Sequence, residues 1–154
     1  FMGGREYQML TGGAVEEISV ADIEAVIAND TCPLPGRLSG VGPFPLGPGG
    51  WTGSSPDTDQ AKIAGATLYL ALMSDTCLSL VGAGDRVVIE GPFAKNTTYA
   101  ELLTALIKCP VHLSTDTTGT ATGAAMLMGY APPPVLGPPL KPMEIKGLTA
   151  IRDR

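Results

Sequence analysis

The segment 31–56 contains six prolines and seven glycines, and it constrains the fold more than any other feature of the sequence. Proline removes a backbone hydrogen-bond donor, and glycine raises the entropy cost of ordering the chain, so periodic structure cannot persist there. A loop of this length inside a compact domain is uncommon and usually has a function or is mobile. We therefore expect regular structure only on either side of this segment.

The size and charge of the chain exclude several classes of protein. Its 154 residues and 15.8 kDa suit one domain that buries roughly two thirds of the surface of the unfolded chain. The formal net charge is −5, and Lys and Arg do not cluster, so no nucleic-acid partner is expected. Only 16% of residues are charged and 44% are hydrophobic, a composition that argues against intrinsic disorder.

The sequence gives no sign of a membrane or secretory segment. The longest uncharged and mainly apolar run, Ile63 to Ser74, is too short to cross a bilayer. No basic stretch followed by an apolar run opens the chain, so no signal peptide is predicted. Three cysteines without a CxxC pair indicate reduced thiols, not a disulfide framework or a zinc site. We expect a cytoplasmic protein, and the sequence leaves open whether it forms a homo-oligomer.

Helical patterns occupy both sides of the Pro/Gly-rich segment. A short helix is predicted over 6–10, and a second one begins at Ser19, where Asp22 completes a capping-box pattern, and ends near Asn29. A long helix is predicted from about Asp57 to Leu80, and Gly82-Ala83-Gly84 ends it. The spacing of its apolar residues predicts that it buries one face: Ile63, Thr67, Leu70, Met73 and Cys77.

The second half of the chain has the pattern of a βαβ unit. Val87-Val88-Ile89 is a short apolar strand, expected to be buried on both faces as in a parallel sheet, and Val111-His112-Leu113 is a second strand. Between them a helix is predicted from about Thr97 to Lys108, with Tyr99, Leu102, Leu103 and Leu106 facing inward. Two strands do not make a stable sheet alone, so either further strands lie in the loop or the chain is part of a longer polypeptide.

The remaining residues predict a helix and a tail. A helix of small residues is expected from about Gly119 to Met128, and residues 131–154 are expected to form an extended, proline-rich tail. His112 is the only histidine and no motif places a nucleophile beside it, so we assign it a structural role. The Gly82-x-Gly84 pattern precedes a strand where a dinucleotide motif must follow one, and no phosphate-binding P-loop is present.

The turn after the first strand is the best candidate for a ligand site. It reads Glu90-Gly91-Pro92-Phe93-Ala94-Lys95-Asn96 and joins the end of a strand to the start of a helix. In α/β folds ligands bind at the carboxyl ends of strands, and the first turn of a helix offers unpaired N–H groups. The residues alone leave two interpretations open, a phosphate-binding turn or a tight turn in which Asn96 caps the helix.

Three segments resemble the C-terminal domain of the FGGY carbohydrate kinases, the family of glycerol kinase, xylulokinase and fuculokinase. Residues 1–10 resemble the helix start that packs against the adenine, and residues 90–96 are similar to the Asp-Gly-Gly-Ala-x-x-Asn turn that meets the phosphates and ribose. Residues 120–125 resemble the Thr-Ala-Leu-Gly-Ala-Ala opening of the last long helix. The three segments follow the order and spacing of the family.

The resemblance implies a set of nucleotide-binding residues. Residues on the adenine side would be Gly4, Tyr7 and Gln8, and residues on the phosphate and ribose side would be Gly91, Pro92, Phe93 and Asn96. Pro92 departs from the family's second glycine and removes an N–H donor, and Phe93 is bulkier than the usual alanine. No catalytic residue and no metal ligand of this chain follows from the resemblance.

The resemblance also implies a fold and an activity. The fold would be part of the C-terminal lobe of an actin-like (ribonuclease H-like) ATPase, with residues 1–130 as its nucleotide-binding portion. The activity would be transfer of the γ-phosphoryl group of ATP to a sugar or polyol, with Mg²⁺, the catalytic base and the sugar site held mainly outside these residues. We therefore expect a kinase fragment that is inactive alone. Two alternatives stay open: another actin-like ATPase domain, or a non-catalytic binding module.

Overall fold

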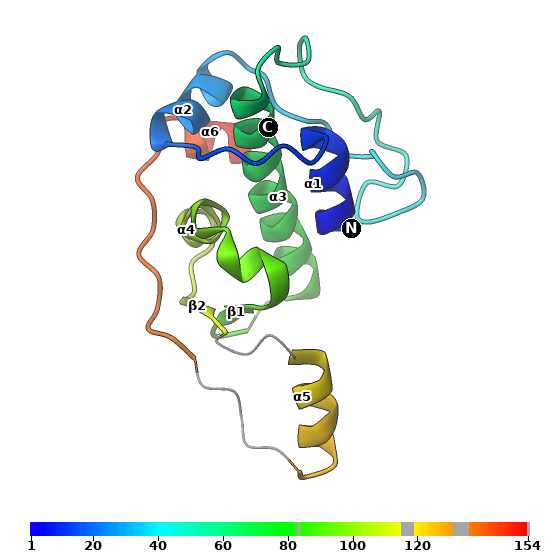
Figure 1. Cartoon of the computed structure of the whole chain (residues 1–154), viewed down its shortest axis with the longest axis vertical. Helices are drawn as coiled ribbons and strands as arrows, with labels where there is room; N and C mark the ends of the chain where they lie inside the picture. The colour runs from blue at the N-terminus through cyan, green and yellow to red at the C-terminus, as the bar shows by residue number, and fades with distance from the viewer. Residues whose placement is uncertain (83, 115–118, 131–135, 154) are drawn as a thin grey trace.

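The computed structural model describes residues 1–82, 84–114, 119–130 and 136–153. Helix α3 stands at the centre, and α1, α2 and α4 pack around it (Figure 1). The elements follow one another as α1 (Gly3–Thr11), α2 (Val20–Ala28), α3 (Asp59–Val81), β1 (Val87–Ile89), the 3₁₀ helix η1 (Gly91–Lys95), α4 (Thr97–Leu106), β2 (Val111–Leu113), α5 (Gly119–Leu127) and α6 (Leu148–Arg152).

Local signals set the helix ends close to where the sequence predicts them. Ser19 accepts a hydrogen bond from the backbone N–H of Asp22, and the Asp22 carboxylate accepts one from the N–H of Ser19, so the capping box is confirmed. The hydrogen bonds that the Asp22 carboxylate accepts from the N–H and the hydroxyl of Ser19 lower the pKa of Asp22. Thr58 caps α3 in a similar way, and Gly82 ends it with a φ of 67°, a left-handed conformation that favours glycine.

Helix α3 buries more than the single face that its apolar spacing predicts. Every residue from Ile63 to Ala71 is buried, because α1, α2 and α4 cover different sides of the helix. By length and composition α3 could cross a membrane, and it is the one such helix within the described ranges. However, 61% of its most apolar window is buried inside the molecule, which is the setting of a core helix.

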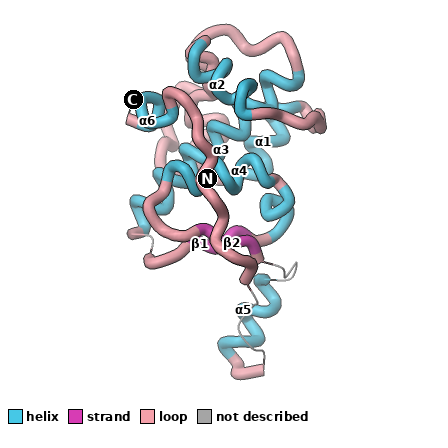
Figure 2. Tube along the Cα trace, turned by 90° about the vertical axis from the view of Figure 1, so that its left-hand side faces the viewer, coloured by secondary structure: helices cyan, strands magenta, loops and turns pink. Residues whose placement is uncertain are grey.

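The predicted βαβ unit is present. Strands β1 and β2 pair in parallel, with Val87 opposite Val111 and Ile89 opposite Leu113, and η1 and α4 form the connection between them (Figure 2). The inward-facing residues of α4 are buried as predicted: Tyr99, Leu102, Leu103 and Leu106. The prediction that β1 is buried on both faces is wrong, because Val87 and Val88 are only half-buried where the described sheet ends at β1.

The proline-rich end of the chain lies along the body of the molecule. The N–H groups of Gly137 and Leu140 donate to the carbonyls of Leu113 and Val111, so this segment covers the outer edge of β2. An exposed edge strand would otherwise offer unpaired N–H and C=O groups to other chains. The His112 ring nitrogen Nδ1 lies 2.8 Å from the carbonyl oxygen of Gly137, which gives the histidine its predicted structural role.

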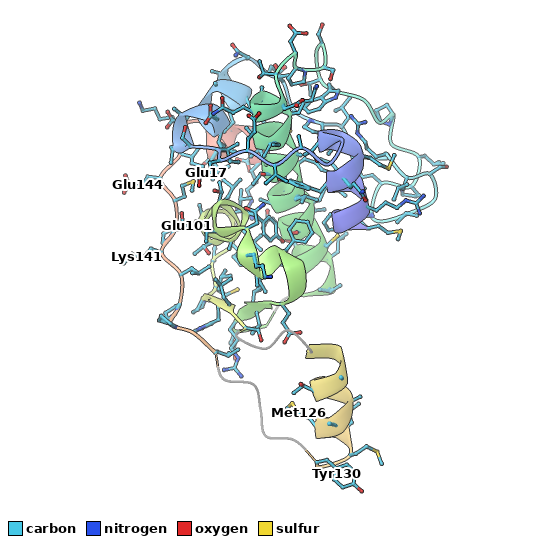
Figure 3. The ribbon with its side chains drawn as sticks, in the orientation of Figure 1. Glu17, Glu101, Met126, Tyr130, Lys141 and Glu144 are labelled. Carbon is cyan, nitrogen blue, oxygen red and sulfur yellow. The ribbon has the colours of Figure 1, made fainter. Side chains whose placement is uncertain are left out.

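The expectation of an extended tail needs a correction at its end. Residues 148–152 form the short helix α6. This helix packs against α4, and its Leu148 side chain is buried. The Arg152 guanidinium also pairs with the Asp75 carboxylate, with Nε 2.8 Å from Oδ2. Residues 136–147 form no helix, and Lys141 and Glu144 extend from the outer side of this stretch (Figure 3). Residues 131–135 of the predicted tail lie outside the described ranges.

The Pro/Gly-rich segment 31–56 forms no helix and no strand beyond one isolated bridge, between Pro33 and Trp51, as predicted. Glycine is required where two parts of the segment touch, since a Cβ on Gly47 would overlap the backbone of Pro35. Another close contact anchors the segment to α3. The Trp51 ring lies over Gly65, where a Cβ would stand 2.7 Å from a ring carbon.

Helix α5 differs from the other helices because little covers it. It projects away from the helical body below the strands, with Met126 in the helix and Tyr130 just beyond its end (Figures 1–3). Its apolar side chains are largely in solvent, and Leu127 is 90% exposed. The helix matches the predicted range within one residue at its end.

Candidate functional site

Two of the segments that resemble the kinase family meet side by side. The rings of Tyr7 in α1 and Phe93 in η1 make an edge contact, with centroids 5.9 Å apart and planes at 88°. A Cβ on Gly4 would stand 3.6 Å from the Phe93 ring, an ordinary contact distance, so Gly4 lies directly against this ring. Phe93 also contacts the buried Tyr99 ring at 5.5 Å. Three of the predicted site residues are therefore in direct contact.

A buried acid–phenol pair holds α1 in this position. The Tyr69 hydroxyl of α3 donates to Oε2 of Glu6 at 2.5 Å, and Oε1 of Glu6 accepts from the N–H of Met2. Burial is the main cause that raises the pKa of Tyr69, and its hydrogen bond to Glu6 adds to the effect. Because Glu6 is 3% exposed, breaking this pair would leave its buried Oε2 without a hydrogen-bond donor. The pair thereby fixes Gly4 and Tyr7 against α3.

One side of the Tyr7–Phe93 contact is hollowed by a cavity of about 380 Å³, a size in the range of small-molecule sites. We call it the apolar cavity, because its walls are mainly hydrophobic. Its lining follows β1 from Val87 to Glu90, just past the carboxyl end of the strand, where α/β folds bind ligands. Its walls come from α1, α3, β1, η1 and α4 and include Phe1, Gly4, Leu70, Ser74, Cys77, Glu90, Phe93 and Tyr99.

The other side of the contact is hollowed by a second cavity, of about 540 Å³. We call it the polar cavity. It lies between the segment 14–18, helix α3 and the start of α4, and its lining includes Tyr7, Glu16, Glu17, Thr67, Lys95, Asn96, Thr97 and Thr98. The predicted site residues are thus divided, with Gly4 and Phe93 on the apolar cavity and Tyr7 and Asn96 on the polar cavity.

The backbone conformation of the turn between β1 and α4 favours a glycine after Glu90. Gly91 has a φ of 71°, in the left-handed region, and no atom lies within 4 Å of the position of a Cβ there. The open space leaves the backbone accessible to a ligand. Pro92 lies in the first turn of η1, and its side chain falls outside the described part of the structure.

Asn96 caps α4. Its Oδ1 accepts from the N–H of Tyr99 at 2.9 Å, so the capping interpretation of this residue is confirmed. Its predicted contact with phosphate or ribose stays a prediction. Gln8 is exposed on α1 and is not part of the lining of either cavity, so the structure does not bring it to the other predicted residues.

The third segment of the resemblance begins beside the turn. A Cβ on Gly119, the first residue of α5, would overlap the Glu90 carboxylate, so this acid lies at the start of α5. A carboxylate near the first turn of a helix is favoured by the helix dipole. The segments 1–10 and 90–96 therefore meet at the Tyr7–Phe93 contact, and the residue just before the segment 120–125 lies beside Glu90, although the three segments are far apart in the sequence.

Several lining residues of the apolar cavity are not among the predicted site residues. Ser74 and Cys77 belong to α3, where the sequence pattern indicates only a core helix. The Ser74 and Tyr99 hydroxyls lie 2.9 Å apart and hydrogen bond, while burial raises the pKa of Tyr99. Their spacing could have indicated a shared surface, because Leu70, Ser74 and Cys77 follow one another at intervals of three or four residues and so lie on one face of a helix.

Comparison with known proteins identifies the family. The family model of the carbohydrate kinase FGGY C-terminal domain matches residues 1–135. The chain belongs to the FGGY carbohydrate kinase family. This chain is also similar to the crystal structure of a carbohydrate kinase from Novosphingobium aromaticivorans, with 27% sequence identity and a TM-score of 0.81. The match covers 100% of this chain and 35% of that kinase. A comparison with curated proteins found no match.

The residues of this FGGY domain fit a nucleotide better than a resident metal ion. The apolar cavity has hydrophobic walls, which suit the ring of a nucleotide base, and the open backbone of Gly91 follows its lining residue Glu90. By contrast, no three His, Cys, Asp or Glu side chains gather anywhere in the described residues.

Proposed function

We propose that this FGGY domain binds the nucleotide in a kinase that transfers the γ-phosphoryl group of ATP to a sugar or polyol hydroxyl. The observation that carries the proposal is the apolar cavity beside β1, which residues of the segments 1–10 and 90–96 line together. The parallel β1–α4–β2 unit supports a further proposal, that the fold is part of an actin-like ATPase lobe.

The lining suggests how a nucleotide would lie. An adenine ring would contact the apolar side chains of Phe1, Leu70 and Phe93. The Glu90 carboxylate would accept hydrogen bonds from ribose hydroxyls but repel phosphates. The phosphates would therefore turn away from Glu90 toward the open backbone of Gly91, which a ligand can approach closely.

Phosphoryl transfer depends mainly on positioning and charge neutralisation, so a nucleotide-binding domain contributes geometry and no acid–base step. We propose that Mg²⁺ is held mainly by the nucleotide phosphates and by other parts of the enzyme, since no three His, Cys, Asp or Glu side chains gather in the described residues. The sugar site and the general base would come from other parts of the enzyme, consistent with a neighbour of which this chain covers only 35%. We also propose a cytoplasmic location, since free cysteines suit a reducing compartment.

The two partly exposed cysteines provide the test. Cys77 lines the apolar cavity, whereas Cys109 lies near the C-terminal end of α4, away from this lining. We expect ADP to slow alkylation of Cys77 by iodoacetamide and to leave the rate at Cys109 unchanged, as measured by mass spectrometry of the 154-residue chain. Equal rates at Cys77 with and without saturating ADP would contradict the proposal.

A second measurement concerns activity. We expect the 154-residue chain alone to release no ADP from ATP in the presence of sugars, because the proposed base and sugar site are supplied by other residues. A coupled ADP-release assay over a panel of sugars and polyols checks this. Sugar-dependent release above the background without protein would show that these residues suffice for the reaction.

A further inference from the structure

The Pro/Gly-rich segment 31–56 has no part in the nucleotide proposal, yet it forms one wall of a further cavity. This cavity measures about 360 Å³, and we call it the loop cavity. Its other walls come from the second half of α3 and from α6. It shares no lining residue with the apolar cavity, so the two cavities lie on different faces of α3.

The stretch 32–35 reads Cys-Pro-Leu-Pro and lines the loop cavity without a free backbone donor. Its two prolines have no N–H group. The N–H of Cys32 donates to the Thr52 hydroxyl at 2.9 Å. The N–H of Leu34 donates to the carbonyl of Gly50 at 3.0 Å. The prolines that prevent periodic structure in this segment therefore also give the cavity a preformed apolar wall.

The hydroxyl groups on the α3 wall also have their partners within the chain. The Tyr69 hydroxyl donates to the Glu6 carboxylate. The Thr76 hydroxyl donates to the carbonyl of Leu72 at 3.0 Å. A water molecule needs two or more polar partners to be held in a cavity, and these groups are already in use. Poorly held water is displaced by an apolar ligand with a gain in affinity.

An ion pair borders the loop cavity on the side of α6. The Arg152 guanidinium donates to both carboxylate oxygens of Asp75, at 2.8 Å and 3.2 Å, so these two charges compensate each other. The lining also includes Asp30, and two carboxylates against one guanidinium give a negative balance that disfavours an anion. The charges therefore favour an uncharged ligand over an anionic one.

Rings and apolar side chains make up most of the remaining lining. Leu72, Met73 and Ile151 line the loop cavity together with the rings of Tyr69 and Phe44. Aromatic rings pack well against other rings and against the sulfur of methionine. We propose that the loop cavity is a binding site for a small uncharged aromatic molecule.

The probe for this site is indole, added to the 154-residue chain and followed by amide chemical shifts in NMR. We expect saturable shifts at Leu34, Leu72 and Met73 with a Kd of about 1 mM. Saturating ADP is expected to leave these shifts unchanged, because the proposed nucleotide site has a separate lining. Benzoate is the anionic probe and is expected to cause no saturable shift at these residues.

The decisive variant is Thr76→Leu, which places a larger apolar side chain in the space that indole would occupy. We expect it to weaken indole binding roughly tenfold or more. Thr76→Val is the matched control, because it removes the same hydroxyl and keeps the volume of the side chain, so indole should bind it as it binds the wild type. Urea denaturation checks that both variants fold.

Phe44→Ala is a second variant, at an exposed ring that the fold can lose at little cost. It removes part of the cavity wall and is expected to weaken indole binding roughly threefold.

Four results would each overturn the inference. They are no saturable shift with indole, saturable binding of benzoate at the same residues, indole affinity unchanged in both Thr76→Leu and Phe44→Ala, and indole shifts confined to Leu70 and Cys77 that ADP abolishes. The last result would place indole in the apolar cavity and would leave the nucleotide proposal intact.

Discussion

The apolar cavity and the polar cavity lie on either side of the Tyr7–Phe93 contact and differ in the chemistry of their linings. The apolar cavity is framed by β1 and by the hydrophobic face of α3, whereas the polar cavity is framed by the capped start of α4 and an acidic segment. A single turn serves both, since Glu90 and Phe93 line the first and Lys95 and Asn96 line the second. The difference teaches that a tight turn between a strand and a helix can supply adjacent residues to two chemically distinct cavities.

The substitution with the largest expected effect removes the aromatic ring that separates the two cavities. Phe93→Ala deletes the ring that contacts Tyr7 and Tyr99, and we expect a loss of about 3 kcal/mol in the free energy of unfolding. We also expect ADP to protect Cys77 less, because the ring borders the apolar cavity. Urea denaturation measures the stability. Phe44→Ala, at a side chain that is 41% exposed, is the control and should cost much less.

A second substitution separates helix capping from ligand binding. Asn96→Ala removes the cap of α4 and is expected to cost about 1 kcal/mol in the free energy of unfolding. Ser19→Ala removes the cap of α2 and should cost a similar amount. Under the proposed function only Asn96→Ala also weakens ADP binding, measured by calorimetry. If both variants bind ADP like the wild type, Asn96 serves only as a cap.

A third substitution tests the turn itself. Gly91→Ala places a side chain at a φ of 71° and is expected to cost about 1 kcal/mol in stability, with no steric overlap to add to it. Its Cβ would occupy the space through which phosphates approach the backbone, so ADP affinity should fall. Gly123→Ala is the control, because its Cβ also meets open space and it lies within helix α5. An ADP affinity equal to that of the wild type would rule out close approach at Gly91.

The smallest expected effect concerns a thiol that lines neither the apolar cavity nor the polar cavity. Burial, with a contribution from Asp30, raises the pKa of Cys32 to about 12 from 9.0. Because the pKa is raised, the folded chain holds this proton more tightly than the unfolded chain does. The contribution of Cys32 to the free energy of unfolding is therefore complete below pH 9.0 and is lost as the pH rises toward 12. Native Cys32 should therefore resist iodoacetamide while Cys77 reacts. Comparable labelling of both in the folded chain would contradict the burial of Cys32.

Local sequence patterns predicted most of the secondary structure of this FGGY domain. The capping box at Ser19, the glycine after α3 and the apolar strands act over a few residues, so each could be interpreted without knowledge of the rest of the chain. The turn at Gly91 was found as a candidate site for the same reason. Its positive φ is a local requirement that glycine meets.

Other features depend on which distant segments pack together. The burial of α3 on all sides comes from three helices that its own periodicity does not reveal. The end of the tail forms α6 because Leu148 packs on α4 and Arg152 pairs with Asp75, contacts that no local pattern of prolines indicates. Likewise, Gln8 was grouped with Gly4 and Tyr7 by resemblance, yet it faces solvent away from both cavities.

By itself the sequence determined where helices begin and end, where the chain turns, and which family the domain resembles, because these follow from the preferences of neighbouring residues. Only the tertiary structure decided that Phe93 and Asn96 line different cavities and that Cys77 faces one of them. The physical reason is that a cavity is formed by side chains from several elements, and its walls are set only when those elements pack.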